Sequence, residues 1–262
     1  MKELPRKIIT LKKKESASVP VNVPAGDGLI RLNKYISNAG VCSRRDADDL
    51  ISKGLVSVNG EVVTELGRKV TLDDDIRFDG KRLNPERKVY ILLNKPKGFV
   101  TTIDDPHADR TVMELVSNAC TERIYPVGRL DIQTTGLLLF TNDGELTTKL
   151  THPSYEKKKV YHVQLDRDLM PEDLDKIING IELEDGLIVA DDIHRIDQDD
   201  ARQVGIEIHS GKNRIVRRIF EHFGYHVEKL DRVLFAGLTK KDLPRGRYRF
   251  LTPQEINFLK MS

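Results

Sequence analysis

One short segment combines residue types that can do chemistry with a spacing that would expose them. Residues 128–136 read Gly-Arg-Leu-Asp-Ile-Gln-Thr-Thr-Gly, so Arg129 and Asp131 lie in a glycine-bracketed loop just before the apolar stretch 137–140. The strand beside such a loop positions its side chains, and the glycines permit a close ligand or a positive φ. The pattern is also typical of a plain turn whose carboxylate accepts backbone amides. The segment is therefore a candidate site that needs support from other residues.

A cluster of four cations lies far downstream of that loop. Lys212, Arg214, Arg217 and Arg218 fall within seven residues, and no acidic residue occurs from position 210 to 220. The apolar spacing predicts a helix from residue 215 whose inner face excludes Arg214, Arg217 and Arg218, with Lys212 just upstream. Because helix N-termini attract anions and guanidinium groups pair with phosphates or carboxylates, the segment predicts an anion site.

Two further segments place basic side chains at the ends of expected strands. Residues 157–159 are three lysines, and Tyr161 follows them, a combination that can grip a nucleic-acid backbone and stack a base. After the apolar strand 89–93, Lys95 and Lys97 fall where proline and glycine end the sheet, so both lysines are expected to be exposed. A lysine run alone means little, so these segments count only in combination.

Several other kinds of site are excluded. The sequence has no Gly-x-x-x-x-Gly-Lys-Ser/Thr loop, no Gly-x-Gly-x-x-Gly loop and no Gly-x-Ser-x-Gly nucleophile turn. His222 and His226 are four residues apart, but Gly224 ends the helix between them, which argues against a zinc pair. Cys42 and Cys120 have neither disulfide nor metal spacing, as expected in a reducing cytoplasm.

Composition bounds the class of protein. The chain has 262 residues, 39% of them hydrophobic, and a net charge of only +2. This length is typical of two domains with a tail. No apolar stretch has the length of a signal peptide or of a membrane span, so we expect a protein that is neither secreted nor membrane-spanning. Residues 1–28, rich in lysine and proline, are expected to form a disordered basic arm.

Local signals predict the elements that position these residues. Apolar spacing predicts a helix within 29–39, and Ser43 with Asp46 predicts the start of a second one. The pair Asn59-Gly60 between valines predicts a tight hairpin. The basic residues of this small unit lie on faces that the apolar stripes leave free: Lys34, Arg44, Arg45 and Lys53.

From residue 89 onward, strands and short helices mix without regular βαβ alternation. Strands are predicted at 89–93, 160–165 and 204–209, and helices at 145–150, at 171–179, from 215 and after Thr252. We therefore expect an α+β fold with a largely antiparallel sheet.

Two sets of motifs resemble known families. The first set, over residues 31–79, resembles the S4-like RNA-binding domain, which is named after ribosomal small-subunit protein four. It consists of an expected helix, Ser-Arg-Arg, a second expected helix and the pattern Gly-x-Val-x-Val-Asn-Gly. The later motifs resemble the bacterial ribosomal RNA pseudouridine synthases of the RsuA/RluB family, in the order found there: Asn94-Lys95-Pro96-x-Gly98, the 128–138 segment, Lys159-x-Tyr161 and Gly211-x-Asn213-Arg214-x-Val216-Arg217-Arg218. The resemblance implies an S4-like domain at 29–88 and a pseudouridine synthase domain at 89–262.

The resemblance also implies roles for particular residues. Asp131 would be the catalytic aspartate, with Arg217 paired to it, while Tyr161 would stack on the target base and Leu230 would pack near the ring. Arg129 would help to hold the RNA open. The implied RNA-binding residues are Lys34, Arg44, Arg45, Lys53, Lys95, Lys97, Arg129, Lys159, Lys212, Arg214 and Arg218. The chain departs from the family at Lys212 and Ile215, where arginine and glutamine or glutamate are usual.

The implied reaction breaks the N-glycosidic bond of a uridine, rotates the uracil and re-attaches it through carbon five, with no metal or organic cofactor. The aspartate would act as nucleophile at the ribose or as proton acceptor, and the sequence leaves both routes open. We expect a monomeric cytoplasmic enzyme that acts on 23S ribosomal RNA or a pre-ribosomal particle. The open alternatives are the same reaction on 16S or transfer RNA, a non-catalytic ribosome-assembly factor, and a nucleosidase that releases uracil.

Overall fold

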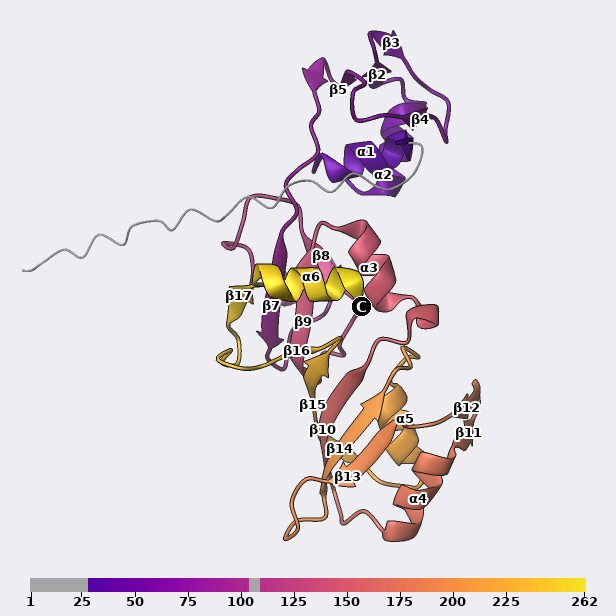
Figure 1. Cartoon of the computed structure of the whole chain (residues 1–262), viewed down its shortest axis with the longest axis vertical. Helices are drawn as coiled ribbons and strands as arrows, with labels where there is room; N and C mark the ends of the chain where they lie inside the picture. The colour runs from indigo at the N-terminus through magenta and orange to yellow at the C-terminus, as the bar shows by residue number, and fades with distance from the viewer. Residues whose placement is uncertain (1–27, 104–108) are drawn as a thin grey trace, which may run out of the picture.

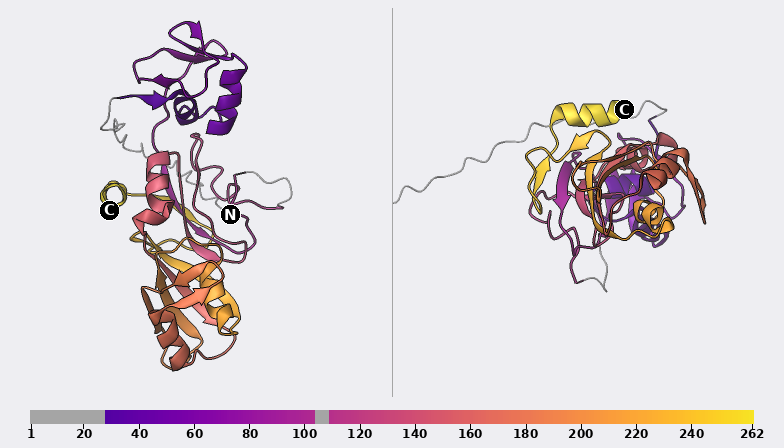
Figure 2. Two further views of the ribbon diagram at one scale, coloured as in Figure 1. Left: turned by 90° about the vertical axis from the view of Figure 1, so that its right-hand side faces the viewer. Right: turned by 90° about the horizontal axis from the view of Figure 1, so that it is seen from below.

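The computed structural model describes residues 28–103 and 109–262, which form an elongated molecule with a small N-terminal unit stacked on a larger one (Figure 1). A side view shows the same stacking (Figure 2). Residues 83–89 connect the two units. The basic arm expected at 1–28 lies, apart from Gly28, outside the described residues.

Local signals account for the N-terminal unit. Its elements are β1 (Ile30–Arg31), α1 (Leu32–Asn38), α2 (Arg44–Ser52), β2 (Val56–Val58), β3 (Glu61–Val62), β4 (Lys69–Val70), β5 (Ile76–Phe78) and β6 (Lys81–Arg82). As predicted, Ser43 and Asp46 form a capping box at the start of α2. Asn59 and Gly60 turn β2 into β3 with φ values of 52° and 87°, the left-handed conformation that a tight hairpin requires.

A nine-stranded sheet dominates the larger unit, and its strand path is β13-β14-β10-β15-β9-β7-β17, with β16 paired to β15 and β8 paired to β9. The strands are β7 (Tyr90–Lys95), β8 (Tyr125–Val127), β9 (Thr135–Thr141), β10 (Lys159–Leu165), β13 (Asp192–Arg195), β14 (Gln203–Ile208), β15 (Val227–Phe235), β16 (Leu238–Thr239) and β17 (Tyr248–Phe250). Its pairings are antiparallel except the one between β15 and β9. The α+β class and the largely antiparallel sheet are therefore confirmed.

Helices pack on both faces of this sheet. One core joins α5 (Ile215–His222) and α4 (Pro171–Asn179) to the β14-β10-β15 half, and the small hairpin of β11 (Ile181–Leu183) and β12 (Gly186–Ile188) contributes to it. A second core joins α3 (Gly144–Thr151) and α6 (Pro253–Met261) to β7 and β9. A short 3-10 turn, η1 (Pro153–Tyr155), follows α3. Neighbouring residues of β9 enter different cores, Leu138 the first and Leu139 the second, as strand alternation requires.

The two halves of the sheet meet at one glycine. Strand β15 pairs with β9 through only two residue pairs, Asp231 with Thr135 and Arg232 with Gly136. A Cβ on Gly136 would lie 2.3 Å from the carbonyl oxygen and 2.6 Å from the nitrogen of Arg232, and its φ is 106°. Only glycine permits this approach. It places the loop 128–134, which precedes β9, at the junction of the two halves.

Candidate active site

A cleft of about 160 Å³ opens at this junction. Its walls come from segments that are distant in the sequence: the loop 128–134, strands β10 and β15, and residues 210–216 leading into α5. Seven residues with expected roles line it: Arg129, Asp131, Lys159, Tyr161, Lys212, Arg214 and Leu230. The fold therefore gathers residues from all of the later motifs except the first.

The carboxylate of Asp131 faces two guanidinium groups. Its Oδ2 lies 4.0 Å from Arg217 Nε and 3.9 Å from Arg214 Nη1, and 35% of the Asp131 side chain is exposed. Arg217 is buried, and its Nη1 donates a 2.8 Å hydrogen bond to the carbonyl of Val227. Burial and the neighbouring Arg214 lower the pKa of Arg217, while Asp131 opposes this change. The site thus holds an accessible anion beside a cation that the backbone fixes in place.

The expectation that Lys95 is exposed and contacts RNA is wrong, because its side chain is fully buried. Its Nζ donates hydrogen bonds to the carbonyls of Asp131 (3.1 Å), Ile132 (3.3 Å) and Thr134 (2.9 Å). A buried ammonium needs such acceptors, and the loop supplies them because β7 continues through Lys95 instead of ending before it. Burial lowers the pKa of Lys95 to about 8. Lys95 therefore supports the Asp131 loop from beneath.

Tyr161 and Leu230 form an apolar wall of the cleft. They project from the neighbouring antiparallel strands β10 and β15 and are 8% and 4% exposed. An aromatic ring beside an aliphatic side chain suits a nucleobase that has left its stack. Lys159 lies two residues before Tyr161, and its Nζ donates to the carbonyl of His209 at 2.7 Å. Burial, with a smaller contribution from Arg232, lowers the pKa of Lys159 to about 8.

The expected cluster of unbalanced cations is only partly present. Arg218 donates two hydrogen bonds, of 2.7 and 2.9 Å, to the carboxylate of Asp185, and Lys212 Nζ donates to the backbone carbonyl of Asp185 at 2.6 Å. The expectation of unbalanced cations is therefore wrong for Arg218 and also for Lys212, whose Nζ lies 3.5 Å from Asp185 Oδ1. Asp185 lies in the turn between β11 and β12, and no local pattern links that turn to α5. Arg214 keeps its place in the cleft and also pairs with Glu221 at 3.2 Å.

The other basic residues lie away from the cleft. Arg44, Arg45 and Lys53 are exposed on α2 and at its end, in the N-terminal unit. Lys34, on α1, is half-buried, and its Nζ lies 2.7 Å from the carboxylate of Glu145 at the start of α3. Lys97 is exposed and lines a second hollow of the larger unit.

Other residues that had no expected role also line the cleft, among them Thr134, Arg232 and Phe235. Thr134 is 2% exposed, and its hydroxyl has no hydrogen-bond partner in the described part of the chain. Arg232 is 3% exposed and donates two hydrogen bonds, of 2.7 and 2.9 Å, to the carbonyl of Leu137, with its guanidinium over the ring of Phe235. Thr134 carried a signal through its place in the loop motif. Arg232 and Phe235 carried none, because strand periodicity does not tell which face borders a cleft.

Residues 28–103 and 109–262 contain no group of three or more histidine, cysteine, aspartate or glutamate side chains placed to hold a metal ion. None of their helices is long and apolar enough to cross a membrane.

Comparisons with known proteins agree with both units. The chain matches the model of the S4 domain over residues 30–76 and that of RNA pseudouridylate synthase over residues 89–222. It is 44% identical to ribosomal large subunit pseudouridine synthase B of Bacillus subtilis (strain 168), over 88% of this chain and 95% of that protein. An RNA pseudouridine synthase of Aquifex aeolicus (strain VF5) is 42% identical, over 87% of this chain and 92% of the relative. A crystal structure of a pseudouridylate synthase aligns with a TM-score of 0.63 at 29% identity, over 88% of this chain and 99% of that chain.

Proposed function

The chain belongs to the RNA pseudouridylate synthase family, and we propose that it isomerises a uridine to pseudouridine in the RNA of the large ribosomal subunit. The choice of RNA is supported by the relative from Bacillus subtilis, which is named for the large subunit and matches 88% of this chain. The observation that carries the proposed chemistry is the accessible carboxylate of Asp131, 4.0 Å from the buried guanidinium of Arg217.

The cleft supplies what this isomerisation needs. Positive charge from Arg217 and Arg214 stabilises the Asp131 anion, which acts at the ribose as nucleophile or as proton acceptor. Tyr161 and Leu230 form the surface on which the detached uracil rotates, so that it re-attaches through carbon five instead of escaping. Lys159 and Arg129 supply cations to the same cleft for the RNA backbone. The reaction as proposed uses no metal or organic cofactor.

The proposal includes the organisation of the chain. We place an S4-like RNA-binding domain at 29–88 and the catalytic domain at 89–262, a division supported by model matches that end at 76 and begin at 89. Arg44, Arg45 and Lys53 are the proposed RNA-contacting residues of the first domain, because they are exposed on one helix and at its end. The enzyme is proposed to act as a cytoplasmic monomer. In keeping with a reducing compartment, Cys42 and Cys120 are both unpaired.

The deciding experiment compares the wild-type protein with Asp131→Asn. Pseudouridines in large-subunit RNA are mapped after incubation of an unmodified transcript with each protein, and RNA affinity is measured in parallel. We expect the wild type to convert one uridine. The variant should lose more than about a thousandfold in rate, as expected when the reacting group itself is removed.

RNA affinity should stay within about twofold in Asp131→Asn, because the grip on RNA comes from cations and not from this carboxylate. Conversion by the variant at the wild-type rate would reject Asp131 as the catalytic group. Free uracil as the product would identify a nucleosidase, and conversion only in small-subunit RNA would correct the substrate.

A further inference from the structure

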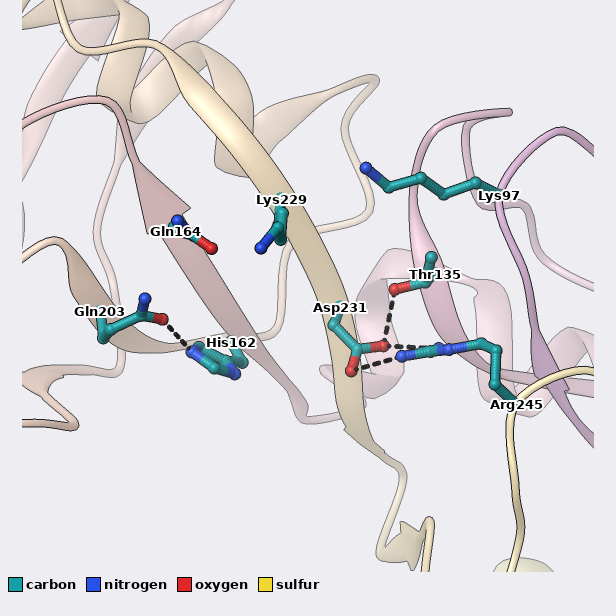
Figure 3. Close-up of a pocket in the computed structure, with 8 residues that line it drawn as sticks. All are labelled: Lys97, Thr135, His162, Gln164, Gln203, Lys229, Asp231 and Arg245. Atoms are coloured by element: carbon teal, nitrogen blue, oxygen red, sulfur yellow. Dashed lines mark hydrogen bonds and ion pairs between the residues drawn. The ribbon is translucent and has the colours of Figure 1, made fainter.

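A second hollow, of about 360 Å³, lies on the face of the sheet opposite the Asp131 cleft. Strand alternation separates the two: His162 and Gln164 of β10 and Lys229 of β15 line this rear hollow, whereas Tyr161 and Leu230, their immediate neighbours, line the cleft. The rear hollow exists because β15 and β9 pair through only two residue pairs, so space remains between the halves of the sheet where pairing stops (Figure 3).

The charges that line the rear hollow are mainly positive. Lys97 and Lys229 are both exposed, and within the described residues neither ammonium has a hydrogen bond or an ion pair. In Figure 3 their side chains reach over the hollow from the loop after β7 and from β15. Two free ammonium groups that line one concave surface favour a ligand with more than one negative charge.

The single carboxylate of the rear hollow does not neutralise these lysines. Asp231 accepts hydrogen bonds from Arg245 Nη1 at 3.0 Å and from Thr135 Oγ1 at 2.9 Å, and Lys240 contacts it as well. Although burial opposes the change, hydrogen bonds from Arg245 and Lys240 lower the pKa of Asp231 to about 2. Asp231 is thus an anion that is already paired with two cations. The net charge of this group of side chains is therefore positive.

The rear hollow and the cleft share one edge. Thr134 lines the cleft and Thr135 lines the rear hollow, so a single peptide bond separates the two surfaces. The backbone nitrogen of Gly98 donates a 2.9 Å hydrogen bond to the carbonyl of Ile132, which ties the loop that carries Lys97 to the Asp131 loop. A polymer with one residue bound in the cleft can therefore continue past Thr134 and Thr135 to reach both lysines. Because both lysines are cations, they favour a polymer with negative charges.

We infer that the rear hollow is a second RNA-contact site, where Lys97 and Lys229 bind phosphates of the same RNA that offers its uridine to Asp131. This inference rests on the proposed function for the identity of the ligand. Gln164 and His162 line the hollow on β10, beyond Lys229 as seen from Lys97 (Figure 3), and present polar side chains to the sugar or base of the bound segment. The site adds affinity for RNA that continues beyond the target uridine.

Lys229 is the residue on which to test the inference, because it lies outside the cleft and its exposed side chain supports no other residue by hydrogen bond in the described part of the chain. The full-length protein and its variants are titrated with a large-subunit RNA transcript between about 50 and 200 mM salt. Lys229→Ala and Lys97→Ala should each reduce the slope of log affinity against log salt by about 0.7 to 0.9, the effect of one lost phosphate contact.

Two matched variants serve as controls. Lys229→Arg keeps the charge and should keep the wild-type slope. Lys176→Ala removes another exposed lysine, which lies on α4 and pairs with Asp173 at 3.1 Å, and should also keep the slope. Unchanged slopes for both Lys229→Ala and Lys97→Ala would overturn the inference. A rear hollow that binds only a free phosphate ion would give this same result, so it would overturn the inference too. If the wild type binds RNA with the expected lysine dependence but forms no pseudouridine, the proposed function fails and the second RNA-contact site stands.

Discussion

At the scale of single residues, the loop that carries Asp131 frees its carboxylate for a ligand. In a plain turn the carboxylate would accept nearby amides, but among the described residues the Asp131 carboxylate forms ion pairs with Arg214 and Arg217 and accepts no hydrogen bond. The carbonyls of the loop are satisfied instead by Lys95 from below and by Thr101, which donates to Leu130 at 2.7 Å. Because the loop is supported through its backbone carbonyls, the carboxylate of Asp131 stays free for the proposed reaction, as a preorganised site requires.

The buried Lys95 should make stability depend on pH. Its pKa is about 8 in the folded protein against an ordinary 10.5, so between these values the unfolded chain binds more protons and the free energy of unfolding rises with pH. Replacing the amine, as in Lys95→Met, removes this rise. Chemical denaturation at pH 7.5 and pH 10 should therefore show the stability difference, wild type minus Lys95→Met, growing by up to about 3 kcal/mol.

The neighbouring exposed lysine provides the control for this measurement. Lys97→Met should follow the wild-type pH dependence, because Lys97 is exposed and lies outside the buried network. A stability difference between wild type and Lys95→Met that shrinks as pH rises would contradict the prediction, since it would mean that the loop carbonyls hold the proton on Lys95 more strongly than burial removes it.

At the scale of elements, the site depends on the short parallel contact between β9 and β15. This contact brings the Asp131 loop to the strand of Leu230, and Gly136 allows it because no side chain fits against the backbone of Arg232. On the rear face the same contact is clamped by Asp231, which Thr135 and Arg245 hold. The cleft and the rear hollow therefore both depend on the contact between β9 and β15.

Gly136→Ala should disrupt the contact between β9 and β15. The new methyl group would overlap backbone atoms that cannot move aside cheaply, and a φ of 106° adds strain, so we expect a loss of about 3 kcal/mol or more of unfolding free energy together with loss of isomerisation. Gly60→Ala is the matched control, because that glycine also has a positive φ but has open space around it; its cost should be about 1–2 kcal/mol, with activity retained. Equal costs in urea denaturation would show that the strand contact is not the cause.

At the scale of the whole molecule, the two units touch through a few polar contacts. The backbone nitrogen of Glu86, in the connecting segment, donates to the carbonyl of Asn38 at 2.8 Å, and its carboxylate accepts from the backbone nitrogen of Arg123 at 3.2 Å. Lys34 and Glu145 add an ion pair between α1 and α3. Such contacts orient the small unit relative to the cleft with little apolar burial, as in domain pairs that adjust to a ligand.

The two partners of that ion pair can be tested separately. If Lys34 contacts RNA, as proposed, Lys34→Ala should weaken RNA affinity and lower its salt slope by about 0.7 to 0.9, whereas Glu145→Ala should leave affinity unchanged or raise it. The pair itself is partly exposed and contributes only about 0–1 kcal/mol to stability, so thermal unfolding should change little in either variant. Equal weakening of RNA affinity by both variants would instead assign Lys34 to the contact between the units.

The sequence by itself determined the elements and the order of the motifs. Capping at Ser43, the turn at Asn59-Gly60 and the apolar spacing of α4 and α5 depend on residues a few positions apart, so local rules sufficed. The family followed from the same ordered motifs and was confirmed by comparison.

Only the tertiary structure decided which of the singled-out side chains share a surface. It placed Arg217 beside Asp131, gave Arg218 to Asp185 and buried Lys95 beneath the loop. Strand alternation already puts Tyr161 and His162 on opposite faces of β10, but only the tertiary structure gave each face a hollow of its own. Burial and charge pairing depend on atoms that the chain brings together from distant segments, and no local pattern in the sequence records where those segments meet.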